Sequence, residues 1–137
     1  MTVEKITAFG HECVTSKHDT TLEITKEREM GWEAHCIVGV KSNKSCADLS
    51  EKLKKAAIEG KRMVINIKAG DVSDRIIAYG HPDLMLTNDH SIVIRRSNFI
   101  DDRTLAIHAS KSSNRLNREL VRKLQDPSQK VEITIEF

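Results

Sequence analysis

The sequence predicts an internally duplicated α+β protein, and three observations carry this prediction. Sliding the 137-residue sequence by 70 positions aligns the tetrapeptide 8–11 (Ala-Phe-Gly-His) with 78–81 (Ala-Tyr-Gly-His). In each half, short apolar and alternating runs precede one segment with helical spacing, and a final alternating run follows it. A doubly wound parallel sheet would need a helix at nearly every crossover, so one helix in each half excludes that fold.

The first half, about residues 2–69, is expected to hold four strands, one helix and a closing strand. The expected strands are 2–9, 12–17, 20–26 and 35–41, the helix is 46–59, and the closing strand is 62–68. Ser45 precedes an apolar stripe that includes Leu49 and Leu53, and Gly60 follows it. A serine cap before the stripe and a glycine after it predict the two ends of this helix.

The second half, about residues 72–137, repeats the same order of signals. The expected strands are 73–79, 83–87, 91–96 and 104–109, the helix is 113–125, and the closing strand is 130–136. Ser112 precedes the apolar residues Leu116 and Leu120, and Pro127 follows the expected helix. At a spacing of 67, Lys44-Ser45 corresponds to Lys111-Ser112.

We expect the two halves to be related by a pseudo-twofold axis and to share one sheet system. This would be a closed or half-open β-barrel, or a curved two-layer sandwich. Because a half of about 68 residues would bury only a marginal core, residues 1–137 are expected to form a single domain.

Composition excludes several classes of protein. Hydrophobic residues make up 39% and charged residues 31% of the chain, which is enough apolar content for a core. No stretch approaches the roughly 20 apolar residues that span a bilayer, so no membrane partner is expected. The beginning of the chain lacks a signal peptide, which predicts a cytoplasmic protein. Cys13, Cys36 and Cys46 are odd in number and lack CxxC spacing, so free thiols are expected.

Basic residues are concentrated in the second half. The net charge is +2 overall, but residues 95–123 hold eight basic and three acidic residues, a net charge of +5. Such a segment could attract a phosphate-bearing partner, and the alternative is a solvated basic surface. Lys44-Ser45 and Lys111-Ser112 are further candidates, since each places an ammonium group at an expected helix N-terminus. The alternative is that serine only caps the helix. Arg115 strengthens the second copy.

Two groups of residues could support catalysis. His11 or His18 could act as a general base oriented by Glu12 or Asp19. Because Gly-His occurs in both halves, a structural corner is the favoured interpretation for His11.

The second group is Asp101 and Asp102, which stand beside Arg103 and could hold Mg²⁺ near a phosphate. A turn is the favoured interpretation of this Asp-Asp-Arg sequence. No other cofactor is expected.

Aromatic residues are few. Phe9 and Tyr79 occupy matching alternating positions and are expected in the core. Trp32 and Phe99 remain as candidate stacking surfaces, too few for an extended single-strand platform.

Several motifs together resemble an archaeal family of small proteins, catalogued as domain of unknown function number 371. The motifs span residues 10–14 (GHECV), 18–21 (HDTT), 36–40 (CIVGV), 44–49 (KSCADL), 95–99 (RRSNF), 102–106 (DRTLA) and 118–120 (REL). Where family members tend to have asparagine, this chain has Cys13. The resemblance implies an archaeal, intracellular protein and supplies no catalytic residues.

The leading hypothesis is a cytoplasmic module that binds phosphate groups, with the nucleic-acid backbone as the main partner. The candidate phosphate-binding residues are Lys44, Ser45, Arg95, Arg96, Ser97, Arg103, Lys111, Ser112 and Arg115. A second hypothesis is a metal-dependent phosphoesterase or endonuclease. In it, Asp101 and Asp102 hold Mg²⁺, Lys111 and Arg103 stabilise phosphate charge, and His11 or His18 moves protons. A third is a structural subunit that docks a protein through a sheet edge or the 30–32 loop.

Overall fold

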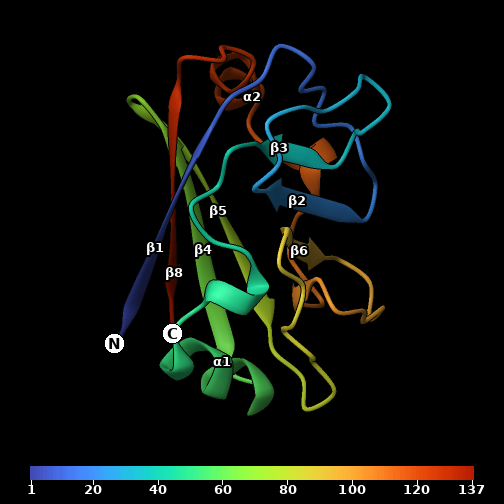
Figure 1. Ribbon diagram of the computed structural model, residues 1–137, viewed down its shortest axis with the longest axis vertical. Helices are drawn as coiled ribbons and strands as arrows, with labels where there is room; N and C mark the ends of the chain where they lie inside the picture. The colour runs from blue at the N-terminus through green and yellow to red at the C-terminus, as the bar shows by residue number, and fades with distance from the viewer.

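The computed structural model describes residues 1–137 and contains eight strands in two sheets, with two α-helices (Figure 1). The elements are β1 (Val3–Phe9), β2 (Thr21–Thr25), β3 (Ile37–Gly39), α1 (Glu51–Ile58), β4 (Arg62–Ala69), β5 (Val72–Tyr79), β6 (Ser91–Arg95), β7 (Thr104–Ala106), α2 (Arg118–Leu124) and β8 (Lys130–Glu136). Short 3-10 turns, Cys46–Asp48 and Ser113–Arg115, precede the two helices. The predicted α+β class is confirmed. Neither helix is long and apolar enough to cross a membrane.

Each sheet has four strands and draws two from each half of the chain. The first sheet has the order β1-β8-β4-β5 and is antiparallel throughout. The second has the order β3-β2-β6-β7, in which the central pair β2 and β6 is antiparallel. Its outer strands β3 and β7 run parallel to their neighbours. The two halves are therefore interleaved in both sheets.

Of the alternatives expected from the sequence, the closed barrel is wrong, because the strands form two separate sheets. The two sheets are joined only by isolated bridges, between Phe9 and Val40 and between Tyr79 and Ile107. The strands β3 and β7 have three residues each and are too short to continue the ladder around a barrel.

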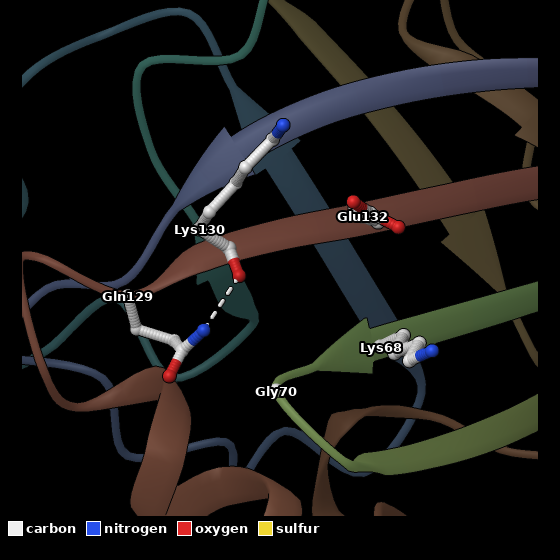
Figure 2. Close-up of a pocket in the computed structure, with 5 residues that line it drawn as sticks. All are labelled: Lys68, Gly70, Gln129, Lys130 and Glu132. Atoms are coloured by element: carbon white, nitrogen blue, oxygen red, sulfur yellow. Dashed lines mark hydrogen bonds between the residues drawn. The ribbon is translucent and has the colours of Figure 1, made fainter.

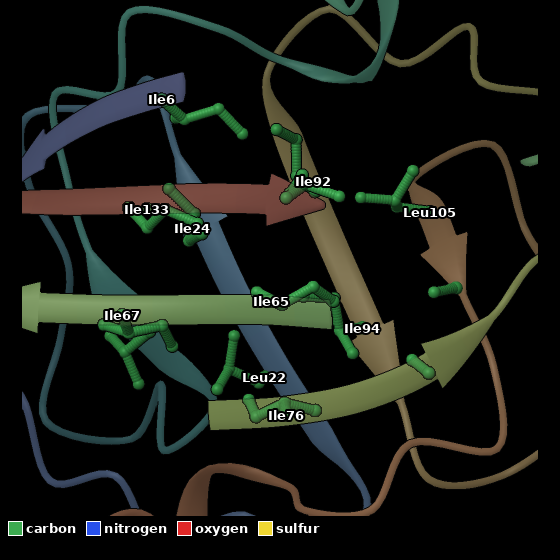
Figure 3. Packing of buried hydrophobic residues seen from close by; sticks show 14 of the residues in the cluster. Ile6, Leu22, Ile24, Ile65, Ile67, Ile76, Ile92, Ile94, Leu105 and Ile133 are labelled. Atoms are coloured by element: carbon green, nitrogen blue, oxygen red, sulfur yellow. The ribbon is translucent and has the colours of Figure 1, made fainter. Parts of the chain in front are cut away.

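The hydrophobic core lies between the two sheets. Ile65 and Ile67 of β4 extend from one sheet toward Ile24 of β2 and Ile92 of β6 on the other (Figure 3). Thirty buried residues form this cluster, to which both helices contribute. At roughly 25 cal/mol per Å² of buried apolar surface, this is the main stabilising contribution to the fold.

The expected strands 12–17 and 83–87 are wrong, because both segments are loops. Ser16 (φ 51°) and Leu86 (φ 55°) adopt the left-handed backbone conformation, which interrupts an extended strand. Lys41 (φ 54°) and His108 (φ 52°) do the same inside the expected strands 35–41 and 104–109. Those two strands are accordingly reduced to three residues each.

Both expected helices begin later than predicted. Leu49 and Leu116 are extended, with ψ of 150° and 146°, and separate each 3-10 turn from its α-helix. The residues that cap the α-helices are Ser50, whose side chain accepts a hydrogen bond from a backbone N–H, and Asn117, which does the same. Ser45 therefore precedes a three-residue turn and not the helix.

The repeated Gly-His pairs close the C-terminal ends of the helices. The N–H of His11 donates to the carbonyl of Leu124 at 2.9 Å, so the loop after β1 closes α2. The N–H of His81 donates to the carbonyl of Ala57 at 2.9 Å, so the loop after β5 closes α1. A Cβ atom at Gly80 would overlap that same carbonyl, which explains the need for glycine.

Phe9 and Tyr79 do not belong to the core, contrary to expectation. Phe9 is half-buried and Tyr79 is 40% exposed. Both side chains lie on the outer face of the first sheet, because each follows a buried alanine and neighbouring residues of a strand point to opposite faces.

Candidate phosphate-binding site

The first predicted lysine, Lys44, is part of the scaffold. Its Nζ lies 3.2 Å from Oε2 of Glu4, a buried carboxylate on β1. The same Glu4 accepts a hydrogen bond from the N–H of Ser50, the cap of α1, at 2.9 Å. Glu4 therefore joins the strand to the start of the helix, and Lys44 neutralises its charge.

Lys111 has the matching role in the second half. Its Nζ lies 2.6 Å from Oδ1 of Asp74 on β5, and Oδ2 of Asp74 accepts from the N–H of Asn117 at 2.8 Å. Burial acts to raise the pKa of Asp74, but the hydrogen bonds from Lys111, Asn117 and Arg75 outweigh it and lower the pKa. Neither predicted lysine is free to bind a phosphate.

Two of the three predicted serines, Ser45 and Ser112, are also engaged within the protein. The hydroxyl and the N–H of Ser45 both donate to Oδ2 of Asp48 at 2.9 Å. The hydrogen bond from the Ser45 N–H, together with the one from Lys26, lowers the pKa of Asp48 to about 2. The hydroxyl of Ser112 lies 2.6 Å from the carbonyl oxygen of Asp19. These contacts hold the two 3-10 turns in place.

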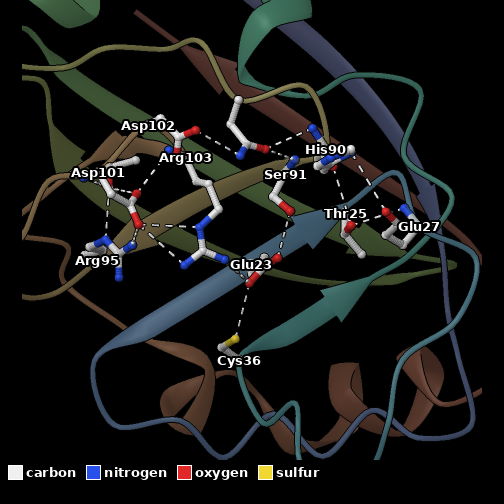
Figure 4. Close-up of polar contacts among 12 residues, drawn as sticks. Glu23, Thr25, Glu27, Cys36, His90, Ser91, Arg95, Asp101, Asp102 and Arg103 are labelled. Carbon is white, nitrogen blue, oxygen red and sulfur yellow. Dashed lines mark hydrogen bonds and ion pairs between the residues drawn. The ribbon is translucent and has the colours of Figure 1, made fainter.

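Arg95 and Arg103 belong to a polar network on the outer face of the second sheet (Figure 4). The buried Arg95 places NH2 3.0 Å from Oδ2 of Asp101, and its Nε donates to Oγ1 of Thr104 at 3.0 Å. Arg103 lies 3.4 Å from Oε1 of Glu23 and 3.5 Å from Asp101. Both guanidinium groups are therefore paired with carboxylates inside the protein.

Asp101 is an acceptor within this network. Burial acts to raise its pKa, but hydrogen bonds from Thr104 and from the Arg103 N–H, with the Arg95 charge, outweigh it and lower the pKa. Asp102 is exposed and accepts from Nδ2 of Asn88 at 3.2 Å. No group of three or more His, Cys, Asp or Glu side chains that could hold a metal ion is present.

Glu23 is a buried carboxylate that sequence reasoning missed. It accepts from Oγ of Ser91 at 2.8 Å and lies 3.5 Å from Sγ of Cys36. Burial and the Glu23 charge raise the pKa of Cys36 to about 11, so the thiol stays protonated and is a weak nucleophile. The sequence held one indication that Glu23 is special, because it is a charged residue between the apolar residues Leu22 and Ile24 of β2.

The predicted catalytic histidines close turns. Nδ1 of His18 accepts from the N–H groups of Thr20 at 3.2 Å and Thr21 at 3.0 Å. Nδ1 of His11 accepts from the N–H of Cys13 at 3.0 Å. Glu12 is exposed at the surface. No hydrogen bond or ion pair connects these three predicted catalytic residues with either predicted metal ligand.

Three of the predicted phosphate-binding residues lie together. Arg96, Ser97 and Arg115 line a shallow, open pocket that contains no hydrophobic residue. The other lining residues are Asp19, Thr20 and Asn114. Arg96 directly follows β6, and because neighbouring residues along an extended strand point to opposite sides, it extends away from the side on which Arg95 is buried. The tertiary structure brings Arg115 beside it from the 3-10 turn 113–115.

The two arginines of this pocket have no carboxylate partner. The N–H of Arg96 donates to the carbonyl of Thr20 at 2.7 Å, and its guanidinium lies 3.3 Å from the carbonyl oxygen of Asp19. Neither Arg96 nor Arg115 forms an ion pair, and Arg115 makes no side-chain hydrogen bond. The carboxylate of Asp19 accepts from Nδ2 of Asn114 at 3.1 Å. Two positive charges therefore share an open, polar surface.

The corresponding place in the first half is neutralised. Lys26 follows β2 as Arg96 follows β6, and its N–H donates to the carbonyl of His90 at 2.8 Å. Asp48 ends the 3-10 turn 46–48 as Arg115 ends the turn 113–115. Nζ of Lys26 lies 3.1 Å from Oδ2 of Asp48. The residue after β2 and the turn 46–48 thus form an ion pair, whereas the residue after β6 and the turn 113–115 carry two unpaired cations.

A second polar pocket lies where the turn between β4 and β5 meets the start of β8 (Figure 2). Lys68, Lys130 and Glu132 line it together with Gly70 and Gln129. Glu132 is the register partner of Lys68, which places a carboxylate among the lysines and makes this pocket a weaker site for an anion.

Two interleaved sheets with two helices and a cationic surface pocket define a small mixed α+β protein. The chain belongs to the family described as Domain of unknown function (DUF371), whose sequence profile matches residues 6–137. It is 44% identical over 121 residues to an uncharacterised protein of the archaeon Methanocaldococcus jannaschii, an alignment that covers 88% of this chain and 90% of that protein. The predicted family resemblance is confirmed, and the relative is archaeal.

Proposed function

We propose that this is a cytoplasmic protein that binds phosphate-bearing ligands, above all the nucleic-acid backbone, through Arg96 and Arg115. The observation that carries the proposal is the pair of guanidinium groups lining one open pocket without a carboxylate partner. Like charges held close together repel each other, and a bound anion relieves this repulsion. Guanidinium groups also match phosphate oxygens with paired hydrogen bonds.

The character of the pocket supports a backbone ligand. It is shallow and open and has no hydrophobic lining, whereas pockets for small organic ligands are concave and mostly apolar. Ser97 and Thr20 add hydroxyl groups that can donate to phosphate oxygens. One carboxylate, Asp19, lies on the rim and limits the positive potential, so we expect modest affinity that falls steeply with salt.

An internal duplication is part of this proposal. The strand registers support it, because Glu23 pairs with Val93 in the centre of β2 and β6, and these positions are 70 residues apart. The pairings of β1 with β8 and of β5 with β4 also match between the halves. In this view two copies of one surface have diverged. The first carries the pair Lys26 and Asp48, and the second has become the anion site.

Fluorescence anisotropy with labelled single-stranded RNA and DNA tests the proposal, at 50 and 200 mM salt and with EDTA. We expect the double variant Arg96→Ala, Arg115→Ala to bind about ten-fold or more weakly, with a salt dependence reduced by about one to two phosphate contacts. Lys26→Ala is the matched control, because it removes a cation already neutralised by Asp48, and it should bind as the unchanged protein does. Equal binding by the double variant, or no binding at 50 mM salt, would overturn the proposal.

The same samples on a denaturing gel address the hydrolase hypothesis. Intact strands after incubation with Mg²⁺ agree with a binding protein. Strand cleavage that requires Mg²⁺ and is lost in Asp102→Asn would replace the binding proposal with the phosphoesterase one.

A further inference from the structure

The arginine pocket contains one carboxylate, that of Asp19, which the two arginines do not neutralise. Asp19 lines the pocket together with Arg96 and Arg115. Its carboxylate forms no ion pair with either guanidinium group. A free carboxylate repels a phosphate that binds beside it. Asp19 therefore weakens phosphate binding, unless the ligand also brings a hydrogen-bond donor to the carboxylate.

The protein holds Asp19 at two points. Nδ2 of Asn114 donates to Oδ1 of Asp19 at 3.1 Å. The carbonyl oxygen of Asp19 lies 2.6 Å from the hydroxyl of the buried Ser112 and 3.3 Å from the guanidinium of Arg96. Oδ2 of Asp19 has no hydrogen-bond partner. One carboxylate oxygen is thus fixed by the protein, and the other is free to accept a hydrogen bond from a ligand.

The first half of the chain lacks this arrangement. Asp89 lies 70 positions after Asp19, and Ala47 lies 67 positions before Asn114. The N–H groups of Ala47 and Asn114 donate to backbone carbonyls of the facing loops at 3.0 and 3.1 Å, so the two segments are positioned alike. Ala47 has no amide that could hold Asp89, and Oδ1 of Asp89 lies 3.2 Å from Nε2 of His90 instead. A carboxylate fixed by an amide is therefore a feature of the arginine pocket.

We propose that Asp19 accepts a hydrogen bond from a ribose 2′-hydroxyl, so that the ligand of this surface is RNA rather than DNA. The inference rests on the proposed function, in which Arg96 and Arg115 hold the neighbouring phosphate. The 2′-hydroxyl is a donor on the carbon next to the one that carries the 3′-phosphate, and DNA has only hydrogen atoms there. A hydroxyl that donates to a carboxylate forms a charge-assisted bond, which is stronger than one between neutral groups. A DNA strand meets the repulsion from the carboxylate without this bond.

The test measures anisotropy in EDTA with three labelled single strands of 12 nucleotides: oligouridylate, its 2′-fluoro form and oligodeoxyuridylate. The 2′-fluoro strand keeps the sugar shape of RNA but has no donor at this position. The unchanged protein should bind oligouridylate about ten-fold more tightly than either of the other strands. Asp19→Ala removes the acceptor and the repulsion together. It should reduce this preference to about two-fold or less and strengthen binding of the DNA strand.

Two further variants separate the role of Asp19 from a general effect of charge. Asp89→Ala is the matched control, because it removes an exposed carboxylate outside the arginine pocket, and it should keep the full preference for RNA. Asn114→Ala leaves both arginines and Asp19 in place but releases the carboxylate from its fixed position. It should reduce the preference for RNA and leave the salt dependence unchanged. Thermal melting of each variant separates loss of binding from loss of folding.

The outcomes distinguish this inference from the proposed function. If the protein binds no strand at all, both fail. If binding depends on Arg96 and Arg115 but RNA and DNA bind equally, only the inference about Asp19 fails. A preference for RNA that persists in Asp19→Ala, or that the 2′-fluoro strand retains, would also overturn it. A preference that requires Mg²⁺ would assign Asp19 to a bridging cation and would overturn it as well.

Discussion

Nζ of Lys111 lies 2.6 Å from Oδ1 of Asp74, and the other oxygen of Asp74 accepts the N–H of Asn117 at 2.8 Å. One carboxylate on β5 thereby holds both the segment before the 3-10 turn and the first turn of α2. Glu4 connects Lys44 and Ser50 in the same way in the first half. These lysines neutralise buried carboxylates that cap helices, which is why they do not take part in the proposed anion site.

Removal of the Asp74 carboxylate should destabilise the protein. Asp74→Ala leaves the N–H of Asn117 and the ammonium of Lys111 without their acceptor, and we expect the free energy of unfolding to fall by about 2–3 kcal/mol. Urea denaturation measures this change. Asp71→Ala is the control, because Asp71 is 91% exposed and 3.6 Å from Lys123. Equal losses in both variants would contradict a capping role for Asp74.

Acid should destabilise the fold in a defined pH range. The pKa values of Asp74 and Asp101 are lowered in the folded protein, and that of Asp48 is lowered to about 2. A carboxyl group whose pKa is lowered on folding adds stability above its unfolded pKa of about 3.9, and this is lost as the pH falls through the folded pKa. Unfolding midpoints should be level from pH 7 to about 5 and decrease from about pH 4 toward pH 2.

The Asp74→Ala variant serves as the control for the acid experiment. It lacks one of the three carboxylates, so its midpoint should decrease less between pH 5 and pH 2 than that of the unchanged protein. A midpoint that is the same at pH 7 and at pH 2.5 would show that these carboxylates do not stabilise the fold.

Gly80 should not tolerate a side chain. In Gly80→Ala the new Cβ atom would overlap the backbone carbonyl of Ala57 at the end of α1, and backbone cannot move aside as a flexible side chain can. We expect a loss of about 3 kcal/mol or more, or failure to fold. Gly31→Ala is the control, since the atoms nearest to its Cβ would be the carboxylate of the exposed Glu33 side chain, which can rotate away. Circular dichroism melting curves of the two variants compare them. A Gly80→Ala protein that melts like Gly31→Ala would refute the close contact.

The three thiols should differ in reactivity. Burial, with the charges of Asp101 and Asp102, raises the pKa of Cys46 to about 12, and its Sγ donates to the carbonyl of Arg103 at 3.1 Å. At pH 8 a thiol reagent should label Cys46 only as fast as the protein unfolds. Cys13 is partly exposed and should react first, and Cys13→Ser should remove that fast phase. Rapid labelling of Cys46 in the folded protein would contradict its burial.

The spacing of apolar residues predicted those features of the fold that depend on residues close together in the chain. Alternation placed Ile65 and Ile67 on the inner face of a strand, and both are fully buried. The same signals failed at Ser16 and Leu86, where hydrogen bonds and packing from distant segments stabilise a left-handed backbone. The predicted helices were too long for a related reason. One extended residue, Leu49 or Leu116, separates the 3-10 turn from the α-helix but leaves the spacing of the apolar residues almost unchanged.

At the candidate site, too, the sequence identified the residue types, and the tertiary structure decided which of them lie together. The sequence identified a basic second half and named Arg96, Ser97 and Arg115 among nine candidates, which lie together in the structure. It did not separate them from Lys111, whose partner Asp74 is 37 positions away.

The sequence by itself therefore determined the α+β class, the position of one helix and a closing strand in each half, and the number of basic residues in the second half, since each follows from composition or from spacing within about ten residues. The tertiary structure alone decided which cations remain unpaired. The physical reason is that neutralisation depends on distances of about 3 Å between groups far apart in the chain, such as Lys26 and Asp48. Only the folded arrangement of the two sheets and their loops sets those distances.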